Sequence, residues 1–183
     1  MIYPIVAYGD PVLKKEAKEI LKDEFDVKEM AENMFETMYK AHGVGLAAPQ
    51  VGKSLRMFVV DAEPFDEEGC KGFKKVFINP EILEESEEEW AFEEGCLSIP
   101  GVREEVFRPE WIKITYLDEN WEQHTEELEG LPARVFQHEF DHIDGILFTD
   151  HISGLKKRMN KKKLLNISKG KVDINYRMKF PSK

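Results

Sequence analysis

Two histidines one helical turn apart are the residues of this chain whose spacing most directly suggests chemistry. His138 and His142 are the first and last residues of an HExxH run, and Glu139 lies between them. On an α-helix this spacing puts both imidazoles on one face, where they can bind one metal ion with the glutamate beside a water on that ion. The run therefore predicts a metal site in which Glu139 acts as a base.

Such a site needs a third protein ligand, and the sequence restricts where it can lie. The common zinc peptidases supply it downstream, as a glutamate or as a third histidine in HExxHxxGxxH. Gly145 matches the glycine of the longer motif, but Phe148 stands where that motif has histidine, and no glutamate follows Glu139. The best candidate lies upstream, at Cys96, and it would complete a Cys-His-His set.

Three short motifs resemble, in order and spacing, those of the peptide deformylase family. They are GVGLAAPQ at residues 43–50, EGCLSIP at residues 94–100 and QHEFDH at residues 137–142. The resemblance runs from about Tyr3 to Phe148, most of the chain. It implies a metal-dependent hydrolase that removes the N-formyl group from the formyl-methionine of newly made polypeptides and releases formate.

The resemblance also implies how the chemistry is divided. One divalent metal would be bound, Fe(II) physiologically, with Zn, Ni or Co possible in a purified sample. Glu139 would take a proton from the attacking water and pass one to the departing amine. The oxyanion of the tetrahedral intermediate would meet the side-chain amide of Gln50 and the backbone N–H of Leu97.

Substrate binding is likewise implied by the resemblance. The peptide would lie as an added strand along Val44 and Gly45, with the methionine side chain in an apolar pocket that His138 helps to line. The residues expected at the substrate are Val44, Gly45, Arg103, Leu131 and Val135. For Arg103 an ordinary surface arginine is an equally open interpretation.

The sequence pattern predicts an α+β fold: short antiparallel sheets around a central metal-binding helix, with a basic C-terminal helix and a terminal strand. Asp26 and Glu29 resemble a capping box, and Pro132 and Gly145 bracket the metal helix. Helices are predicted at residues 26–43, 132–145 and 152–168. Strands are predicted at residues 56–61, 75–79, 111–117, 121–125 and 172–180. We expect residues 1–150 to form the catalytic core and residues 151–183 to extend the same domain.

Composition excludes several classes of protein. The 183 residues are 42% hydrophobic and 34% charged, as in globular proteins, and no apolar run is long enough to span a bilayer. The N-terminus does not resemble a signal peptide. Cys70 and Cys96 are the two cysteines. Because Cys96 sits in a motif that needs a thiolate, we expect a reducing cytoplasm and no role for Cys70.

The charge is divided unevenly along the chain. Residues 151–183 hold eleven Lys and Arg against one acid, Asp173, whereas residues 1–150 hold 15 basic and 35 acidic residues. A basic helix of this kind could dock on ribosomal RNA through phosphates, without base specificity, where formyl-methionyl nascent chains emerge. A solvated helix face remains the alternative.

Two competing functions stay open at this point. An ordinary HExxH zinc peptidase would need a downstream ligand that the sequence does not offer. A structural metal site in an interaction protein would be closed by four protein ligands, whereas only three credible ligands are present. Three ligands leave a position for water, which favours catalysis.

Overall fold

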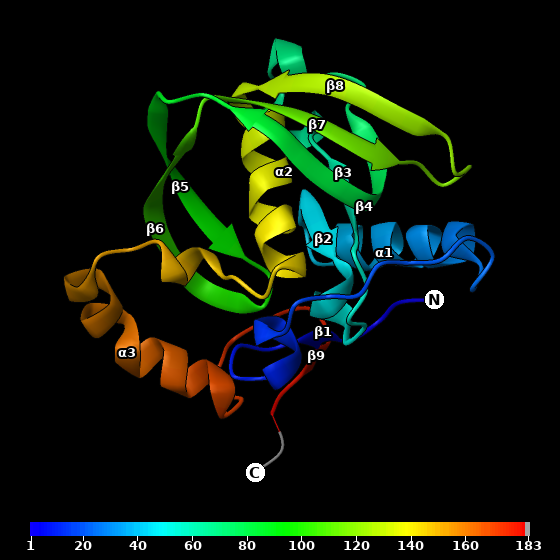
Figure 1. The fold of residues 1–183 in the computed structure, drawn as a ribbon. Coiled ribbons are helices and arrows are strands. Elements are labelled where there is room, and N and C mark those ends of the chain that lie inside the picture. The colour runs from blue at the N-terminus through cyan, green and yellow to red at the C-terminus, as the bar shows by residue number, and fades with distance from the viewer. Residues whose placement is uncertain (182–183) are drawn as a thin grey trace.

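The computed structural model describes residues 1–181, and its central element is the helix α2 (Gly130–Ile143). A five-stranded antiparallel sheet, in the order β2-β3-β4-β7-β8, curves over one side of α2, and a β5–β6 hairpin covers another (Figure 1). The sheet strands are β2 (Gly45–Ala47), β3 (Met57–Asp61), β4 (Lys74–Glu85), β7 (Trp111–Leu117) and β8 (Gln123–Glu129). The hairpin consists of β5 (Glu89–Cys96) and β6 (Ile99–Pro109). The predicted mixed architecture of helices and antiparallel sheets is therefore observed.

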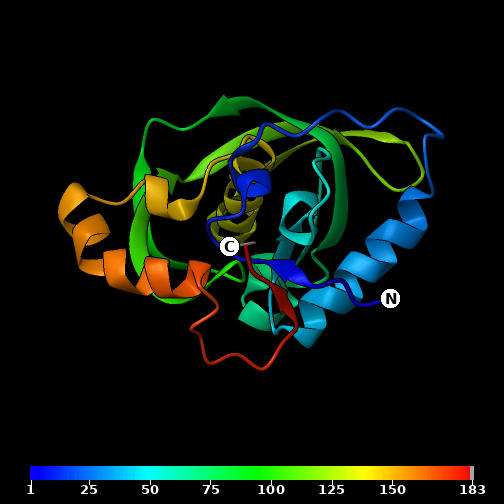
Figure 2. The same cartoon turned by 90° about the horizontal axis from the view of Figure 1, so that it is seen from below.

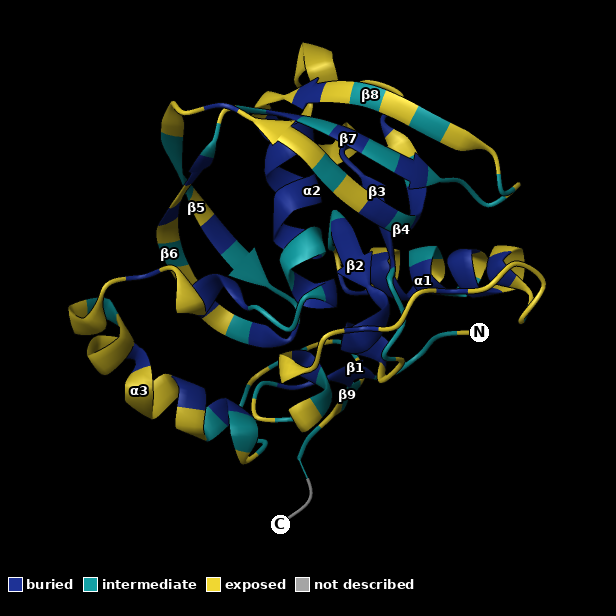
Figure 3. Ribbon diagram, in the orientation of Figure 1, coloured by how far each residue is buried: buried dark blue, intermediate teal, exposed yellow. Residues whose placement is uncertain are grey.

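Helix α2 is buried on nearly every face (Figure 3). Its Phe136 packs edge-on against Phe58 of β3 and Phe77 of β4, with ring centroids 5.1 and 5.0 Å apart. Gly145 follows the helix at φ +74°, and a Cβ there would lie 2.7 Å from the carbonyl oxygen of Lys14. Only glycine fits this turn, so the sequence stops the metal helix where it was predicted to stop.

Helix α1 (Val27–Lys40) begins as predicted at Asp26, whose carboxylate accepts hydrogen bonds from the N–H groups of Lys28 and Glu29. Its Met34 and Met38 are fully buried. These methionines are core residues, as their helical spacing indicated.

Several predicted strands differ in length from the observed ones. Strand β7 spans the predicted 111–117, but β4 continues to Glu85, and β8 begins at Gln123 because Trp121 adopts a left-handed conformation in the turn, at φ +62°. The β5–β6 hairpin was not predicted. Residues 102–108 of β6 do alternate between inward and exposed positions. The inward set, however, includes the charged Glu104 and Arg108, and the exposed set includes Phe107, so the alternation is not visible as a hydrophobic pattern in the sequence.

The tail contains the predicted helix, α3 (Gly154–Ser168), but a shorter strand than expected, β9 (Met178–Lys179). Residues 172–180 alternate between half-buried and exposed, as a strand would. Only two of them pair, because their partner β1 (Ile5–Val6) is itself two residues long and pairs in parallel. Figure 2 shows the segment after α3 running back beneath the molecule to β1.

Helix α3 packs against the hairpin through few residues. Leu164 and Ile167 are buried against apolar residues that include Val102 and Val106 of β6, while most of the basic residues of α3 are exposed (Figure 3). No helix within residues 1–181 is long and apolar enough to cross a membrane.

Candidate active site

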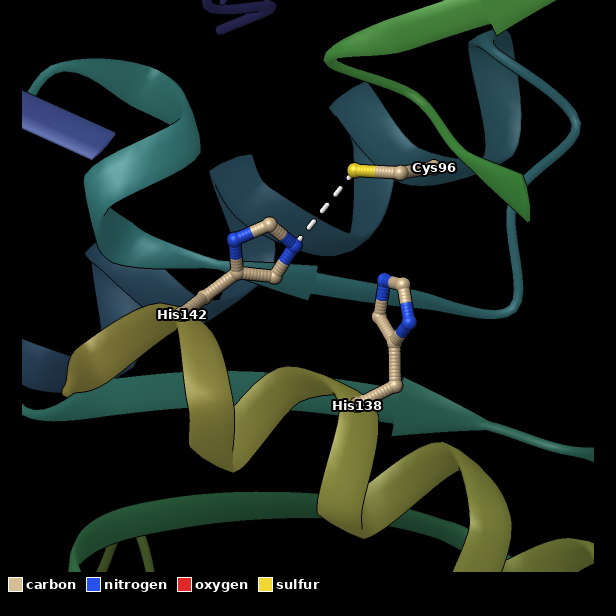
Figure 4. A group of neighbouring side chains, drawn as sticks. All are labelled: Cys96, His138 and His142. Atoms are coloured by element: carbon tan, nitrogen blue, oxygen red, sulfur yellow. Dashed lines mark hydrogen bonds between the residues drawn. The ribbon is translucent and has the colours of Figure 1, made fainter. Parts of the chain in front are cut away.

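The three predicted ligands, Cys96, His138 and His142, come together at the end of β5. Their ligand atoms all lie within 4.8 Å of one another, and Cys96 Sγ is 3.4 Å from Nε2 of His142. Figure 4 shows the two imidazoles rising from successive turns of α2 while the cysteine approaches from the hairpin. One thiolate and two imidazoles at this spacing suit one divalent transition metal.

His138 is held by a buried carboxylate. Its Nδ1 donates to Oε1 of Glu94 at 2.8 Å, which leaves Nε2 free to bind a metal. Burial alone would raise the pKa of Glu94, but hydrogen bonds from His138 and Arg108 lower it, so Glu94 is ionised. Such a carboxylate–histidine contact fixes both the tautomer and the direction of the ring.

Two buried arginines complete this arrangement. Arg108 donates to both oxygens of Glu94, at 2.7 and 3.0 Å, and also to Asp141 at 2.8 Å. Arg134 donates to Oε2 of Glu94 at 2.8 Å. Glu94 therefore joins two turns of α2 to the hairpin that carries Cys96.

Glu139 is buried between α2 and β2. Burial raises its pKa to about 7, and its Oε2 has no hydrogen-bond partner within residues 1–181. A Cβ on Gly45 would lie 2.6 Å from Oε1 of Glu139. The glycine is thus required by the close approach of the carboxylate, which is free to exchange a proton near neutral pH.

Gln50 presents its amide N–H₂ to the ligand side of the site. Its Oε1 accepts from the N–H of Ala47 at 2.9 Å, which fixes the orientation of the amide. Its Nε2 lies 3.4 Å from Cys96 Sγ and 3.2 Å from Ser98 Oγ. A fixed donor beside the metal ligands has the position that an oxyanion donor needs.

A cavity of about 810 Å³ opens over these residues. Four of the five residues expected to bind substrate lie in its wall: Val44, Gly45, Arg103 and Val135. Gln50, Leu97, His138 and Glu139 line the same cavity. Leu131 is different. It is buried in the apolar core beside Val135 and is not part of the cavity wall among the described residues. Arg103 is exposed at the mouth, next to Glu93.

Some residues of the site were not assigned by sequence reasoning. Glu94 lies in the second motif but received no role, and nothing in the local pattern pointed to Arg108 or Arg134. Phe65, from the loop between β3 and β4, also lines the cavity, as do residues 173–176 of the tail. These groups reach the site through contacts distant in sequence, which no local pattern reveals.

Phe148 occupies the position where the longer peptidase motif has its third histidine. It is 1% exposed, and its ring stacks 6.1 Å from that of His138. An aromatic side chain in this place supports the imidazole and cannot ligate a metal.

Comparison with known proteins agrees with the geometry. Residues 2–158 match the model of the polypeptide deformylase family. A peptide deformylase from Cytophaga hutchinsonii is 61% identical over the whole of both chains. The crystal structure of the peptide deformylase from Thermus thermophilus, 42% identical, aligns over 93% of this chain and 100% of that one with a TM-score of 0.84. That of Thermotoga maritima, 48% identical, aligns over 84% and 99% with a TM-score of 0.77.

The motifs, the convergence of a cysteine with the HExxH histidines, and these relatives lead to one conclusion: the chain belongs to the polypeptide deformylase family, hydrolases that remove the N-formyl group from the formyl-methionine of newly made polypeptides.

Proposed function

We propose that Cys96, His138 and His142 bind the single catalytic metal of this enzyme, Fe(II) under physiological conditions. The convergence of the three ligand atoms within 4.8 Å carries this proposal. The hydrogen bond from Nδ1 of His138 to Glu94 supports it, because it leaves Nε2 of the same ring free for ligation. Both histidines are also buried. The bound metal would supply Lewis acidity that lowers the pKa of a water molecule toward neutrality.

The residues of the chain then handle the proton and the developing charge. Glu139 takes the proton of the attacking water and later delivers it to the nitrogen of the departing methionine. Its pKa near 7 suits both directions of transfer at neutral pH. Gln50 and the backbone N–H of Leu97 donate to the oxygen of the formyl carbonyl as negative charge builds on it.

The peptide is proposed to add a strand to the sheet at β2. This strand pairs with β3 on one side and is at the edge of the five-stranded sheet, so its other side is open to an extended chain. Val44 and Gly45 also line the cavity. The methionine side chain would then lie among Val44, Val135 and His138, whereas Leu131 would act from behind by supporting Val135.

Two substitutions test the metal and the base. Cys96→Ser should lose both metal and activity, because a hydroxyl is a poor substitute for a thiolate. The same change at Cys70, a buried thiol outside the cavity, is the matched control and should keep the metal. Glu139→Gln should keep the metal and lose the rate, because an amide accepts no proton.

The assay is release of formate from formyl-Met-Ala under anaerobic conditions, with metal analysis of the same samples. Anaerobic handling matters because Fe(II) beside a thiolate is open to oxidation. A Cys96→Ser protein with full metal content and full rate would disprove the ligand assignment. Turnover of Glu139→Gln within a few-fold of the unsubstituted enzyme would place the base elsewhere.

We further propose that α3 docks on ribosomal RNA, and that the enzyme works in the cytoplasm where nascent chains emerge. Five cations of α3 are exposed, and none of them forms an ion pair in the described part of the chain: Lys157, Arg158, Lys161, Lys162 and Lys163. Lys156 instead pairs with Glu104 at 3.4 Å. Neutralising contacts with phosphates would relieve repulsion within the cluster, and affinity would fall steeply with salt.

Replacing Lys157, Lys161 and Lys162 with glutamine tests this docking without removing the tail from the cavity. Co-sedimentation with ribosomes at low salt should be lost, while activity on short formyl-peptides persists. The matched control replaces three exposed lysines elsewhere with glutamine: Lys15, Lys22 and Lys28. Equal co-sedimentation of both triple variants, or no co-sedimentation of the unsubstituted protein at any salt concentration, would show that α3 is only structural.

A further inference from the structure

The segment at residues 173–176 forms part of the active-site wall, although it follows the metal helix by about thirty residues and lies beyond the region that the family model matches. The β1–β9 pairing anchors it. Ile5 N–H donates to the carbonyl of Arg177 and Ala7 N–H to that of Lys179, both at 2.9 Å. The tail is therefore fixed against the body of the enzyme on the C-terminal side of these residues.

One side chain of this segment reaches the turn that follows Cys96. The hydroxyl of Tyr176 donates to the carbonyl oxygen of Leu97 at 2.7 Å. Burial, the largest cause, raises the pKa of Tyr176 to about 12, so the phenol keeps the proton that it donates.

The turn itself is short and held at several points. Cys96 pairs with Ile99 across it, so Leu97 and Ser98 are its only two residues. The Ser98 carbonyl accepts from the N–H of Tyr8 at 2.8 Å, and its hydroxyl accepts from the amide of Gln50 at 3.2 Å. Of the two peptide carbonyls in the turn, the one belonging to Leu97 depends on Tyr176.

We propose that Tyr176 is a positioning residue. Its hydroxyl fixes the Leu97–Ser98 peptide plane and so, through the Leu97 Cα, restricts rotation of the preceding Cys96–Leu97 peptide, whose N–H points to the formyl oxygen. The inference rests on the proposed role of Leu97 as an oxyanion donor. Rotation of the turn would swing this N–H away from the cavity while leaving Cys96 and the histidines in place. Tyr176 therefore affects the transition state without touching the substrate's reacting atoms.

Tyr176→Phe tests the proposal because it removes one hydroxyl and keeps the ring. Loss of a complete oxyanion donor costs roughly 10²–10³ in rate, and loss of its orientation costs a part of that, about 5- to 20-fold in kcat. KM for formyl-Met-Ala and the metal content should stay within twofold of the unsubstituted enzyme. Tyr3→Phe is the matched control. Tyr3 packs in the same apolar cluster, but its hydroxyl accepts from Asn33 instead.

A purely structural role would lower the thermal midpoint of Tyr176→Phe and leave kcat unchanged well below that temperature. The inference is overturned if kcat stays within twofold of the unsubstituted enzyme, or if the loss of rate follows loss of metal. These results differ from failure of the proposed function, in which the unsubstituted enzyme releases no formate or Cys96→Ser retains full activity.

Discussion

Replacing Glu94 with glutamine should damage both stability and metal binding, although Glu94 itself binds no metal. Each oxygen of Glu94 accepts two hydrogen bonds. Oε1 accepts from Arg108 and His138, and Oε2 accepts from Arg108 and Arg134. Whichever oxygen is replaced by the amide NH₂, the two N–H groups that donated to that oxygen will face another donor. Arg108 and Arg134 will also lose the negative charge that they share.

The magnitude follows from the burial of the partners. Glu94 is 4% exposed, and Arg108 and Arg134 are 5% and 2% exposed. Arg108 keeps Asp141 as a partner, whereas Arg134 has no other carboxylate in ion-pair range among the described residues. Breaking one side of a buried pair typically costs about 3–5 kcal/mol. For a chain of this length that corresponds to a fall in Tm of roughly 6–20 °C.

Urea unfolding and chelator competition measure the two effects. Loss of a carboxylate that orients a ligating histidine typically weakens metal binding about 10- to 100-fold. The matched control is Glu105→Gln, an exposed position on the same hairpin, which should change the unfolding free energy by less than about 0.5 kcal/mol. If Glu94→Gln unfolds within about 1 kcal/mol of that control and binds metal equally well, Glu94 does not hold His138 in place.

Three further predictions concern the site. Gly45→Ala should lower kcat by about 10² or more with the metal retained, because the new Cβ would lie 2.6 Å from the Glu139 carboxylate. Formate release and metal analysis test this prediction, and a fall in kcat of only a few-fold would contradict it. Gln50→Leu should lower kcat more than it raises KM in steady-state assays, since an oxyanion donor acts in the transition state, and the reverse pattern would assign Gln50 to ground-state binding. Removing the metal with a chelator should abolish activity and lower Tm, and both should return with added Fe(II); a metal-free protein of unchanged Tm would show that the site contributes nothing to folding stability.

Much of the active site is determined by sequence, because its spacing is local. His142 follows His138 by four positions, and any α-helix puts residues at this spacing on one face. Gly145, whose Cβ would collide with the Lys14 carbonyl, and Asp26, which caps α1, likewise mark the ends of helices in the sequence. The pattern of residues 111–117 gives β7 correctly, since strict alternation is read on a single strand.

Other features are decided only by the tertiary structure. The β5–β6 hairpin carries Cys96 to α2, and the alternation of β6 is hidden in the sequence because the charged Glu104 and Arg108 occupy inward positions. Leu131 lies behind the cavity wall, because the direction in which α2 faces the sheet is set by packing around Phe136.

The contacts that hold the ligands and the turn are also products of folding. Glu94 meets Arg134 across 40 residues and Tyr176 meets Leu97 across 79. Hydrogen bonds of this kind depend on the distance and orientation of elements that are far apart in the chain. Local propensity and periodicity carry no information about those distances, so the sequence identifies the reacting groups and the fold decides what orients them.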